Sequence, residues 1–554
     1  MSAERRLTEN GMERAETGYV SLRAMMSAIR IQERHAHQRG SGVSIAGIDR
    51  RALSRRLYER FRNEISDEAV NGLCRRRPQE SAKRLMTRRQ ALIAAALLAG
   101  SCIAFAAAPA QTFVALNVLA ALYFIAAVFF RMALMILSRR DAVGATRPHA
   151  PSDDVLPVVT ILLPLYRDGA SLPSLAQAIG ALDYPAHKKD VKLLLEEDDA
   201  ETLAAAIALG LDARYDIIIA PPEGPRTKPK ACNVGLQLAR GDLIVIYDAE
   251  DVPEPDQLKK AAAAFAAGDK HLACVQARLN FYNHDDNWLT QLFTLEYSLW
   301  FDWLLPGLQR LGAPIPLGGT SNIFRTETLI AAGGWDPYNV TEDADLGLRL
   351  ARLGYRVEVL DSTTFEEANC RAGNWLRQRS RWLKGYLQTW LVHMRDPARI
   401  IRATGWTGFL SVQMFVAGAL FSAVVNPLMI ALSLVWFAAG AGAPSLPAAL
   451  LALNLAALVA GNLFFALTLV FAPVKRNAGR PSAYGLTAPA YWLLTSLAAY
   501  KALAQAATRP HYWEKTDHVI SPAARQRNEA ARAALDVSGE TTPAPCHRLQ
   551  DAPI

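Results

Sequence analysis

The chain contains few cysteines and no early apolar segment. Its six cysteines are scattered through 554 residues without metal-ligand spacing, so we expect free thiols in a reducing compartment. The first long apolar run begins only after about 90 mostly polar residues. A secretory signal has its apolar region within the first 15–30 residues, so none is expected here.

Charged residues are missing from two long stretches, residues 91–130 and 404–474. About 20 apolar residues are enough for a membrane-spanning helix. Ala108-Pro109-Ala110-Gln111 interrupts the first stretch, which predicts two helices joined by a tight turn. The second stretch has room for at least two spans, and Tyr484–Tyr500 is a third, shorter candidate.

The charge that is present is distributed unevenly. Residues 1–90 hold 20 Lys and Arg against 11 Asp and Glu, and Arg139-Arg140 follow the first apolar stretch. The positive-inside rule therefore places the N-terminus and the segment after Arg139-Arg140 in the cytoplasm. That segment, residues 141–402, has a net charge of about −8. Nucleic acid is therefore not expected as a partner, although the whole chain has a net charge of +8.

Within the acidic segment, buried strands and helices alternate. Apolar, β-branched runs typical of strands buried on both faces occur at residues 158–163, 191–195, 215–220 and 242–247. Ala-rich helical stretches separate them at residues 172–182, 201–211 and 232–239. This alternation predicts an α/β fold with a doubly wound, mostly parallel sheet. Ligands of such sheets bind beyond the carboxyl ends of the strands.

Three of the predicted strands lead into polar loops. These loops are Tyr166-Arg167-Asp168, Glu196-Glu197-Asp198-Asp199 and Asp248-Ala249-Glu250-Asp251. Each loop alone is as well explained by solvated surface charge. Three of them on one sheet edge favour a binding site instead.

The last of these loops has the composition of a metal site. If the backbone is extended, Asp248 and Glu250 point into one cleft and Asp251 turns away, although Asp251 remains a rival ligand. Paired carboxylates suit Mg²⁺ or Mn²⁺, which also bind phosphate oxygens. The basic loop of residues 226–230 contains Lys228 and Lys230, which would complement a diphosphate. Taken alone, that loop is better explained as a solvated turn.

Two further motifs complete a family pattern. Thr341-Glu342-Asp343 follows the loop Asp248-Ala249-Glu250-Asp251, here called the aspartate loop. Gln378-Arg379-Ser380-Arg381-Trp382 follows about 35 residues later. From about Val158 to Trp382 the chain resembles the family 2 glycosyltransferases of the membrane-embedded, cellulose-synthase-like kind, which includes bacterial exopolysaccharide synthases. The resemblance implies a GT-A-like, Rossmann-type domain inserted between transmembrane helices.

The resemblance also implies roles for individual residues. Asp343 would be the base that activates the acceptor hydroxyl. By sequence spacing alone, Asp343 is also explained as an acid in the first turn of a helix over residues 342–353 that Thr341 caps. Nucleotide-sugar contacts are expected from Tyr166, Glu196, Glu197, Lys228, Lys230, Asp248, Gln378, Arg381 and Trp382. Acceptor contacts are expected from Gly319, Thr320, Ser321, Asn322, Glu342 and Trp382, although Gly318-Gly319 is also explained as a plain turn.

The chain departs from the family pattern at two places. Glu250 stands where the family usually has its second metal-binding aspartate, so Asp248 and Glu250 are the expected ligands, with Asp251 as the alternative. The acid that reads the base in an Asp-Asp-Gly pattern corresponds to Glu196 or Glu197, but no glycine follows here.

Two aromatic segments lie outside the motifs. Asn287 to Gly307 suits either a helix at the lipid headgroup level or an aromatic core helix. His511 to His518 resembles the Trp- and Thr-containing segment that works near the nucleotide in related synthases, and this places it in the cytoplasm. A full span at Tyr484–Tyr500 would conflict with that placement unless the preceding run holds an odd number of spans.

Together these observations predict an inverting glycosyltransferase of a bacterial inner membrane. The expected organisation is a basic cytoplasmic region (1–90), a transmembrane hairpin (91–137), the catalytic domain (141–402), two or three transmembrane helices (404–505) and a tail (506–554). The leading hypothesis is processive extension and export of a β-linked polysaccharide from a nucleotide-sugar, most commonly a UDP-sugar in this family. The alternatives are transfer of one or two sugars to a lipid, and an inactive scaffold or transporter.

The expected partners follow from these hypotheses. They are the nucleotide-sugar donor, a growing glycan or lipid acceptor, and membrane lipids. Residues 1–80 suit a regulatory nucleotide, a partner protein or anionic lipid, but a solvated arm explains them best.

Overall fold

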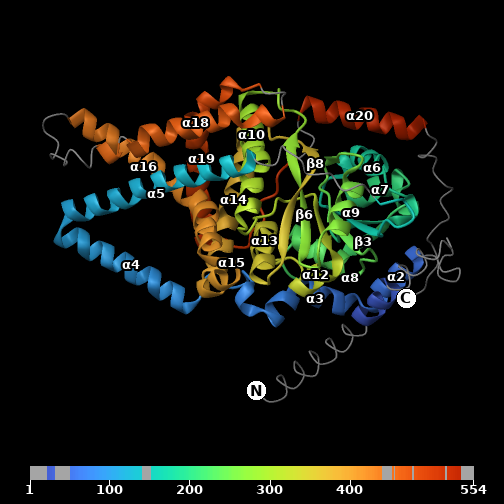
Figure 1. The fold of residues 1–554 in the computed structure, drawn as a ribbon. Helices are drawn as coiled ribbons and strands as arrows, with labels where there is room; N and C mark the ends of the chain where they lie inside the picture. Colours follow the sequence, from blue (N-terminus) through green and yellow to red (C-terminus); the bar gives the residue numbers. More distant parts are fainter. Residues whose placement is uncertain are drawn as a thin grey trace, which may run out of the picture.

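The computed structural model describes residues 22–30, 50–139, 151–439, 452–454, 456–476, 480–517 and 521–537. An α/β domain lies beside a group of long helices, and helices α10 and α14 stand between the two parts (Figure 1). His518, the end of the expected Trp-containing segment, lies outside the described residues.

The α/β domain is built on one eight-stranded sheet in the order β3-β2-β1-β4-β7-β6-β8-β5. Neighbours β3-β2-β1-β4 and the pair β6-β8 are parallel, whereas β7 and β5 pair antiparallel. The strands are β1 Val159–Leu165, β2 Lys189–Glu196, β3 Asp216–Ala220, β4 Leu243–Ile246, β5 Val252–Pro253, β6 Leu272–Phe281, β7 Asn322–Arg325 and β8 Arg356–Glu366. The predicted mostly parallel sheet is confirmed, and the four predicted strands are β1 to β4.

Helices cover both faces of the sheet, as a doubly wound fold requires. Ile161 and Leu163 of β1 pack in one core with α6, α7 and α9, while Leu162 packs in the other with α8, α12 and α13. These helices are α6 Leu172–Gly180, α7 Ala200–Ala208, α8 Lys228–Gln237, α9 Gln257–Ala267, α12 Thr326–Ala332 and α13 Glu342–Arg352. Because β1 is buried on both faces, its sequence is continuously apolar rather than alternating.

The described part of the N-terminal region is not a solvated arm, so that expectation is wrong. Helices α2 (Arg50–Arg60) and α3 (Arg62–Arg76) lie against the α8 side of the sheet. Ile65 and Ala69 are buried in the same core as Leu162, and the Asn233 amide of α8 donates to the carbonyl of Ala69. The apolar residues recur at helical spacing among charged ones, which is why the segment packs despite its composition.

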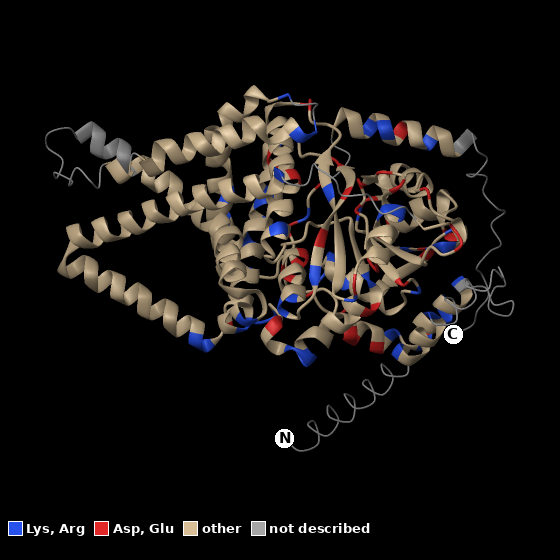
Figure 2. Cartoon of the chain, in the orientation of Figure 1, with Lys and Arg blue, Asp and Glu red and all other residues tan. Residues whose placement is uncertain are grey.

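In the described part of the chain, four helical stretches are long and apolar enough to cross a membrane. They are Arg88–Ala107 (α4), Pro109–Ser138 (α5), Pro397–Ala431 and Ala452–Lys475. The third stretch contains α15 (Pro397–Val412), a π-helical turn (Gln413–Ala417) and part of α16, and the fourth contains a π-helical turn (Ala456–Ala460), α18 (Gly461–Phe471) and a 3₁₀ turn (Ala472–Lys475). Figure 2 shows few charged residues on them, in contrast to the α/β domain. The candidate Tyr484–Tyr500 falls mainly on α19 (Ala488–Thr508), which is not among the four and packs along α14 (Ala372–His393) and α16 (Gly418–Ala439).

The aromatic segment at residues 287–307 forms a core rather than an exposed surface helix. It consists of α10 (Trp288–Leu299), a π-helical turn (Trp300–Leu304) and α11 (Leu305–Leu311). Phe293 is fully buried in a cluster that joins Leu279 of β6 to Leu134 of α5 and Leu469 of α18. This segment therefore connects the sheet to the apolar helices.

Candidate active site

One continuous cavity, with a volume of about 520 Å³, reaches from the sheet edge into the apolar helices. Its sheet end is lined by Tyr166, Glu196 and Asp248, which follow or end β1, β2 and β4. Its other end lies between α5, α16, α18 and α19. The polar loops predicted to share a sheet edge therefore do meet at one site.

The aspartate loop is a tight turn. After β4 ends at Ile246, the N–H of Asp251 donates to the carbonyl of Asp248 at 3.2 Å. Asp248 and Glu250 line the cavity, whereas Asp251 is buried behind it and accepts hydrogen bonds from the N–H of Asp248 and the hydroxyl of Thr320. The structure thus brings together the two expected ligands and turns the alternative away.

Lys228 is the cation that faces this loop. Its Nζ lies 2.5 Å from one carboxylate oxygen of Asp248 and donates to the carbonyl of Gly319 at 2.6 Å. Burial lowers the pKa of Lys228, but the carboxylates of Asp248 and Glu342 outweigh burial and raise it above its usual range. Lys228 therefore stays charged where a donor diphosphate would lie.

The donor set around Asp248 fits a hard divalent cation. Burial, followed by the charges of Asp251, Glu250 and Asp248, raises the pKa of Glu366 well above its usual range, so this end of the cavity favours added positive charge. Among the described residues, no three His, Cys, Asp or Glu side chains form a ready metal cluster. Asp248 and Glu250 are two carboxylates at this end of the cavity that could hold such a cation.

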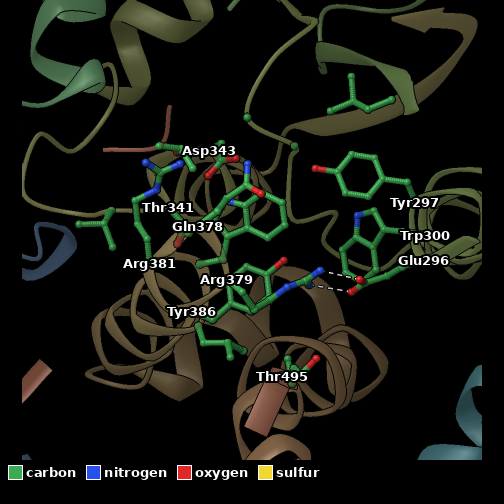
Figure 3. Close-up of a pocket in the computed structure, with 18 of the residues that line it drawn as sticks. Glu296, Tyr297, Trp300, Thr341, Asp343, Gln378, Arg379, Arg381, Tyr386 and Thr495 are labelled. Carbon is green, nitrogen blue, oxygen red and sulfur yellow. Dashed lines mark hydrogen bonds and ion pairs between the residues drawn. The ribbon is translucent and has the colours of Figure 1, made fainter. Parts of the chain in front are cut away.

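Asp343 lies in the first turn of α13, in the middle of the cavity (Figure 3). Burial raises its pKa to about 6, although the N–H of Ala344 and the charge of Lys228 lower it. Burial and the neighbouring Asp343 raise the pKa of Glu342 to about 8, although the charge of Lys228 lowers it. A Cβ added at Gly319 would lie 3.6 Å from Oδ2 of Asp343, so the loop predicted to contact the acceptor lies beside this carboxylate.

The expected Thr341 cap is wrong. Thr341 occupies the N-cap position of α13, but its side chain makes no capping hydrogen bond. Its hydroxyl instead lies 3.4 Å from the hydroxyl of Thr389 on α14. Thr341 therefore joins α13 to α14.

Helix α14 supplies the Gln-x-x-Arg-Trp residues. Gln378, Arg381 and Trp382 all line the cavity, and Figure 3 shows Arg381 and Gln378 beside Asp343. Burial lowers the pKa of Arg381, while Glu342 and Asp248 act in the opposite direction. Trp382 belongs to an aromatic group, with its ring centroid 6.3 Å from that of Tyr297.

The segment at residues 511–517 lies across the sheet end of the cavity. Arg381 donates to the carbonyl of Glu514 at 3.0 Å and its Cζ lies 4.7 Å from the ring centroid of Trp513. Lys515 donates to the backbone carbonyls of Tyr166 and Arg167. Helix α20 (Pro522–Val537) packs beyond it on α6.

Several predicted residues do not line the cavity. Lys230 is buried in the first turn of α8 and donates to Glu196 at 2.8 Å, while Glu197 is half exposed and pairs with Arg62 of α3. Ser321 and Asn322 are buried behind the loop that holds Gly319 and Thr320. Apart from these four residues and Asp251, the predicted site residues line the cavity, among them Glu196, Tyr166 and Glu342.

Other residues of the site were not predicted. Glu366 ends β8, and Glu296 of α10 forms a two-bond ion pair with Arg379. Arg226 pairs with Asp198 at 2.6 Å beside the sheet end. Arg226 and Arg379 had a sequence signal, since they stand in the basic loop and within Gln-x-x-Arg-Trp. Glu366 and Glu296 had none, because they belong to elements that come together only in the fold.

The family model described as glycosyl transferase family group 2 matches residues 243–471. A probable glycosyltransferase of Bacillus subtilis is 27% identical over 42% of this chain and 55% of its own length. A beta-monoglucosyldiacylglycerol synthase of Trichormus variabilis is 26% identical over 43% of this chain and 50% of its own length. A cellulose synthase catalytic subunit of Komagataeibacter xylinus is 28% identical over 45% of this chain and 33% of its own length. The chain spans about half the length of the first curated relatives that it matches.

Among solved structures, a mannosyltransferase of Pyrobaculum calidifontis in complex with GDP-mannose and Mn²⁺ is 21% identical. It covers 70% of this chain and 99% of its own, with a TM-score of 0.49. The family match falls on the segment that contains the Asp248 loop, Asp343 and Arg381. The chain therefore contains a family 2 glycosyltransferase domain, as its motifs predicted.

Proposed function

We propose that the protein transfers a sugar, with inversion, from a nucleotide-sugar to an acceptor held by its membrane helices. The observation that carries this proposal is the single cavity in which Lys228, Asp343 and Arg381 face one another and which continues between the apolar helices. A donor would enter at the sheet end, and an acceptor from the membrane end. The family uses mostly UDP-sugars, so a UDP-sugar is the first donor to test.

The donor diphosphate would lie between cations at the sheet end. Lys228 and Arg381 supply fixed positive charge, and guanidinium pairs well with phosphate oxygens. Asp248 and Glu250 would hold Mg²⁺ or Mn²⁺, which when bound neutralises charge on the leaving nucleotide. The segment at residues 511–517 would cover this end and exclude water through its contacts with Arg381 and Lys515.

Asp343 is the proposed general base. In the described part of the chain its Oδ1 is buried and accepts no hydrogen bond, so it is available to the proton of an acceptor hydroxyl. As Oδ1 takes that proton, the acceptor oxygen bonds to the anomeric carbon, and the bond from that carbon to the nucleotide diphosphate breaks. This single displacement converts an α-linked donor into a β-linked product.

An aromatic surface would orient the acceptor sugar. Trp382, Tyr297 and Trp300 line the cavity, and Figure 3 shows Tyr297 and Trp300 on one side of it, beside Glu296. The apolar face of a pyranose stacks well on such rings. The same surface would suit repeated addition to one chain, so processive extension of a β-linked glycan is the form of this function that the motifs favour.

The proposal is tested with protein purified into lipid nanodiscs and given a panel of UDP- and GDP-sugars with Mg²⁺ or Mn²⁺. Release of nucleotide and of labelled product is measured for the wild type and for Asp343→Asn. Asp343→Asn should lose transfer by at least about a hundredfold, the lower range for removal of a general base. Asp285→Asn, which removes an exposed carboxylate outside the cavity, is the matched control. Full transfer by Asp343→Asn would rule out the assigned base.

Product analysis separates the two forms of the reaction. A distribution of long β-linked chains from one acceptor supports processive extension. Products of one or two sugars on lipid support single transfer.

We further propose that the N-terminal region and the catalytic domain are cytoplasmic, consistent with an even number of spans before residues 511–517. Cysteine labelling from either side of inverted vesicles tests this orientation.

A further inference from the structure

The helix bundle contains a positive charge that the proposed chemistry does not use. Arg131 lies on α5, within a stretch apolar enough to cross a membrane, and it lines the same cavity as Asp343. It stands seven residues before Ser138 at the end of α5, which is about 10 Å along the helix axis. A charged side chain at this depth is costly, and such residues usually mark a ligand site or a pathway.

Arg131 has no anionic partner among the described residues. Its guanidinium makes no hydrogen bond or ion pair with them, and its Cζ lies 4.5 Å from the ring centroid of Phe465. The carboxylate whose charge acts on it is Glu296. That carboxylate already accepts hydrogen bonds from Arg379 at 2.5 and 2.7 Å and from the hydroxyl of Tyr491 at 2.6 Å. Glu296 is therefore balanced by Arg379, and the charge of Arg131 is not.

Polar groups accompany Arg131 along the cavity. The amide of Asn426 on α16 donates to the side-chain oxygen of Asn462 on α18 at 3.2 Å, and both residues line the cavity with Ser422. Phe124, two turns before Arg131 on the same face of α5, also lines it. The membrane end of the cavity thus combines the cation of Arg131, two amides and several hydroxyls with apolar walls.

We propose that this part of the cavity takes a lipid whose head group carries a phosphate. The phosphate would sit on the guanidinium of Arg131, and a free hydroxyl of the head group would reach toward Asp343 as the acceptor. A guanidinium fork matches phosphate oxygens, whereas an uncharged glycan would leave the cation uncompensated. The apolar walls suit the lipid chains. This inference rests on the proposed function and specifies its acceptor.

Binding is tested first, without any requirement for activity. Wild-type protein, Arg131→Gln, Arg131→Lys and Arg139→Gln are compared in mixed nanodiscs of phosphatidylglycerol and phosphatidylcholine, and retained lipid is counted by native mass spectrometry. Arg139 is the matched control, because it is an exposed cation at the end of α5 and does not line the cavity. Arg131→Gln should retain phosphatidylglycerol on the order of ten- to a hundredfold more weakly. Arg131→Lys should fall between it and the wild type, and Arg139→Gln should match the wild type.

Transfer is then measured to phosphatidylglycerol, to a polyprenyl-linked sugar phosphate, to diacylglycerol and to a neutral oligosaccharide. The first two acceptors distinguish the sources of the phosphate, and with either one kcat/KM should fall in Arg131→Gln by the factor seen in binding. Equal wild-type transfer to diacylglycerol or oligosaccharide, or unchanged lipid retention by Arg131→Gln, would overturn the inference. Nucleotide release is measured in the same variants with the donor alone and with each acceptor, and it keeps the two proposals apart. If the wild type releases no nucleotide with any donor and acceptor, the proposed function is refuted instead.

Discussion

The rate of sugar transfer should fall as the pH drops through the pKa of Asp343. Burial raises this pKa to about 6, in opposition to the N–H of Ala344 and the charge of Lys228. A general base acts in its ionised form. With this pKa, about nine-tenths of the carboxyl is ionised at pH 7 and about one-tenth at pH 5. The value of kcat/KM should therefore be roughly tenfold lower at pH 5 than at pH 7.

Two substitutions near Asp343 test the physical origin of this fall in kcat/KM at low pH, the acid limb of the pH profile. Because Lys228 lowers the pKa of Asp343, Lys228→Gln should move the midpoint of the limb to higher pH. It should also lower kcat/KM at every pH by about 10- to 100-fold, through the lost charge-assisted contact to the donor. Glu342 has a pKa of about 8 and is mostly protonated at pH 7, so Glu342→Gln should leave the midpoint near 6.

The assay follows nucleotide release from protein in nanodiscs at subsaturating donor, with the metal concentration fixed, between pH 5 and 9. Under these conditions kcat/KM reports groups of the free enzyme. An acid limb in Lys228→Gln that keeps the wild-type midpoint would refute the electrostatic reasoning. A wild-type limb that persists in the residual activity of Asp343→Asn would assign it to another group.

Three further predictions concern the metal and the support of the site. Asp248→Asn should raise the Mn²⁺ concentration needed for half-maximal transfer at least tenfold, measured by metal titration, whereas an unchanged titration would place the metal elsewhere. Asp345→Ala leaves Arg349 buried without its 2.5 Å partner and should lower stability by about 3–5 kcal/mol, measured by denaturation in detergent. Gly347→Ala places a Cβ 2.1 Å from the carbonyl oxygen of Ile315 and should lower stability by about 1–3 kcal/mol. Melting temperatures equal to the wild type's in Asp345→Ala and Gly347→Ala would contradict the packing described.

The first half of the sheet could be predicted from the sequence, but the second half could not. Strands β1 to β4 are short apolar runs separated by helices, so the local pattern identifies them. Strands β6, β7 and β8 pair across long intervals, with β7 antiparallel between β4 and β6. No local signal sets that order, because it depends on contacts between residues far apart in the chain.

The basic loop shows how local geometry decides which candidate residues reach a site. Residues 226–230 were expected to form a loop, in which both lysines could face phosphate. Helix α8 begins at Lys228. Side chains two positions apart in a helix point about 200° apart around the helix axis. Lys228 therefore faces Asp248, while Lys230 turns inward to Glu196. Sequence spacing located the cations, and the helix start selected one of them.

A similar selection applies within Gln-x-x-Arg-Trp, where the unspecified second position carries a structural function of its own. Arg379 is held by Glu296 of α10, and its Cζ lies 5.0 Å from the ring centroids of both Trp375 and Trp382. Burial lowers its pKa, but Glu296 and Tyr491 outweigh burial and raise it above the usual range, so the arginine stays charged among the rings. It thereby fixes the indole of Trp382 relative to α10 and α19. The motif thus positions the aromatic surface that we propose for the acceptor as well as the cation that we propose for the donor.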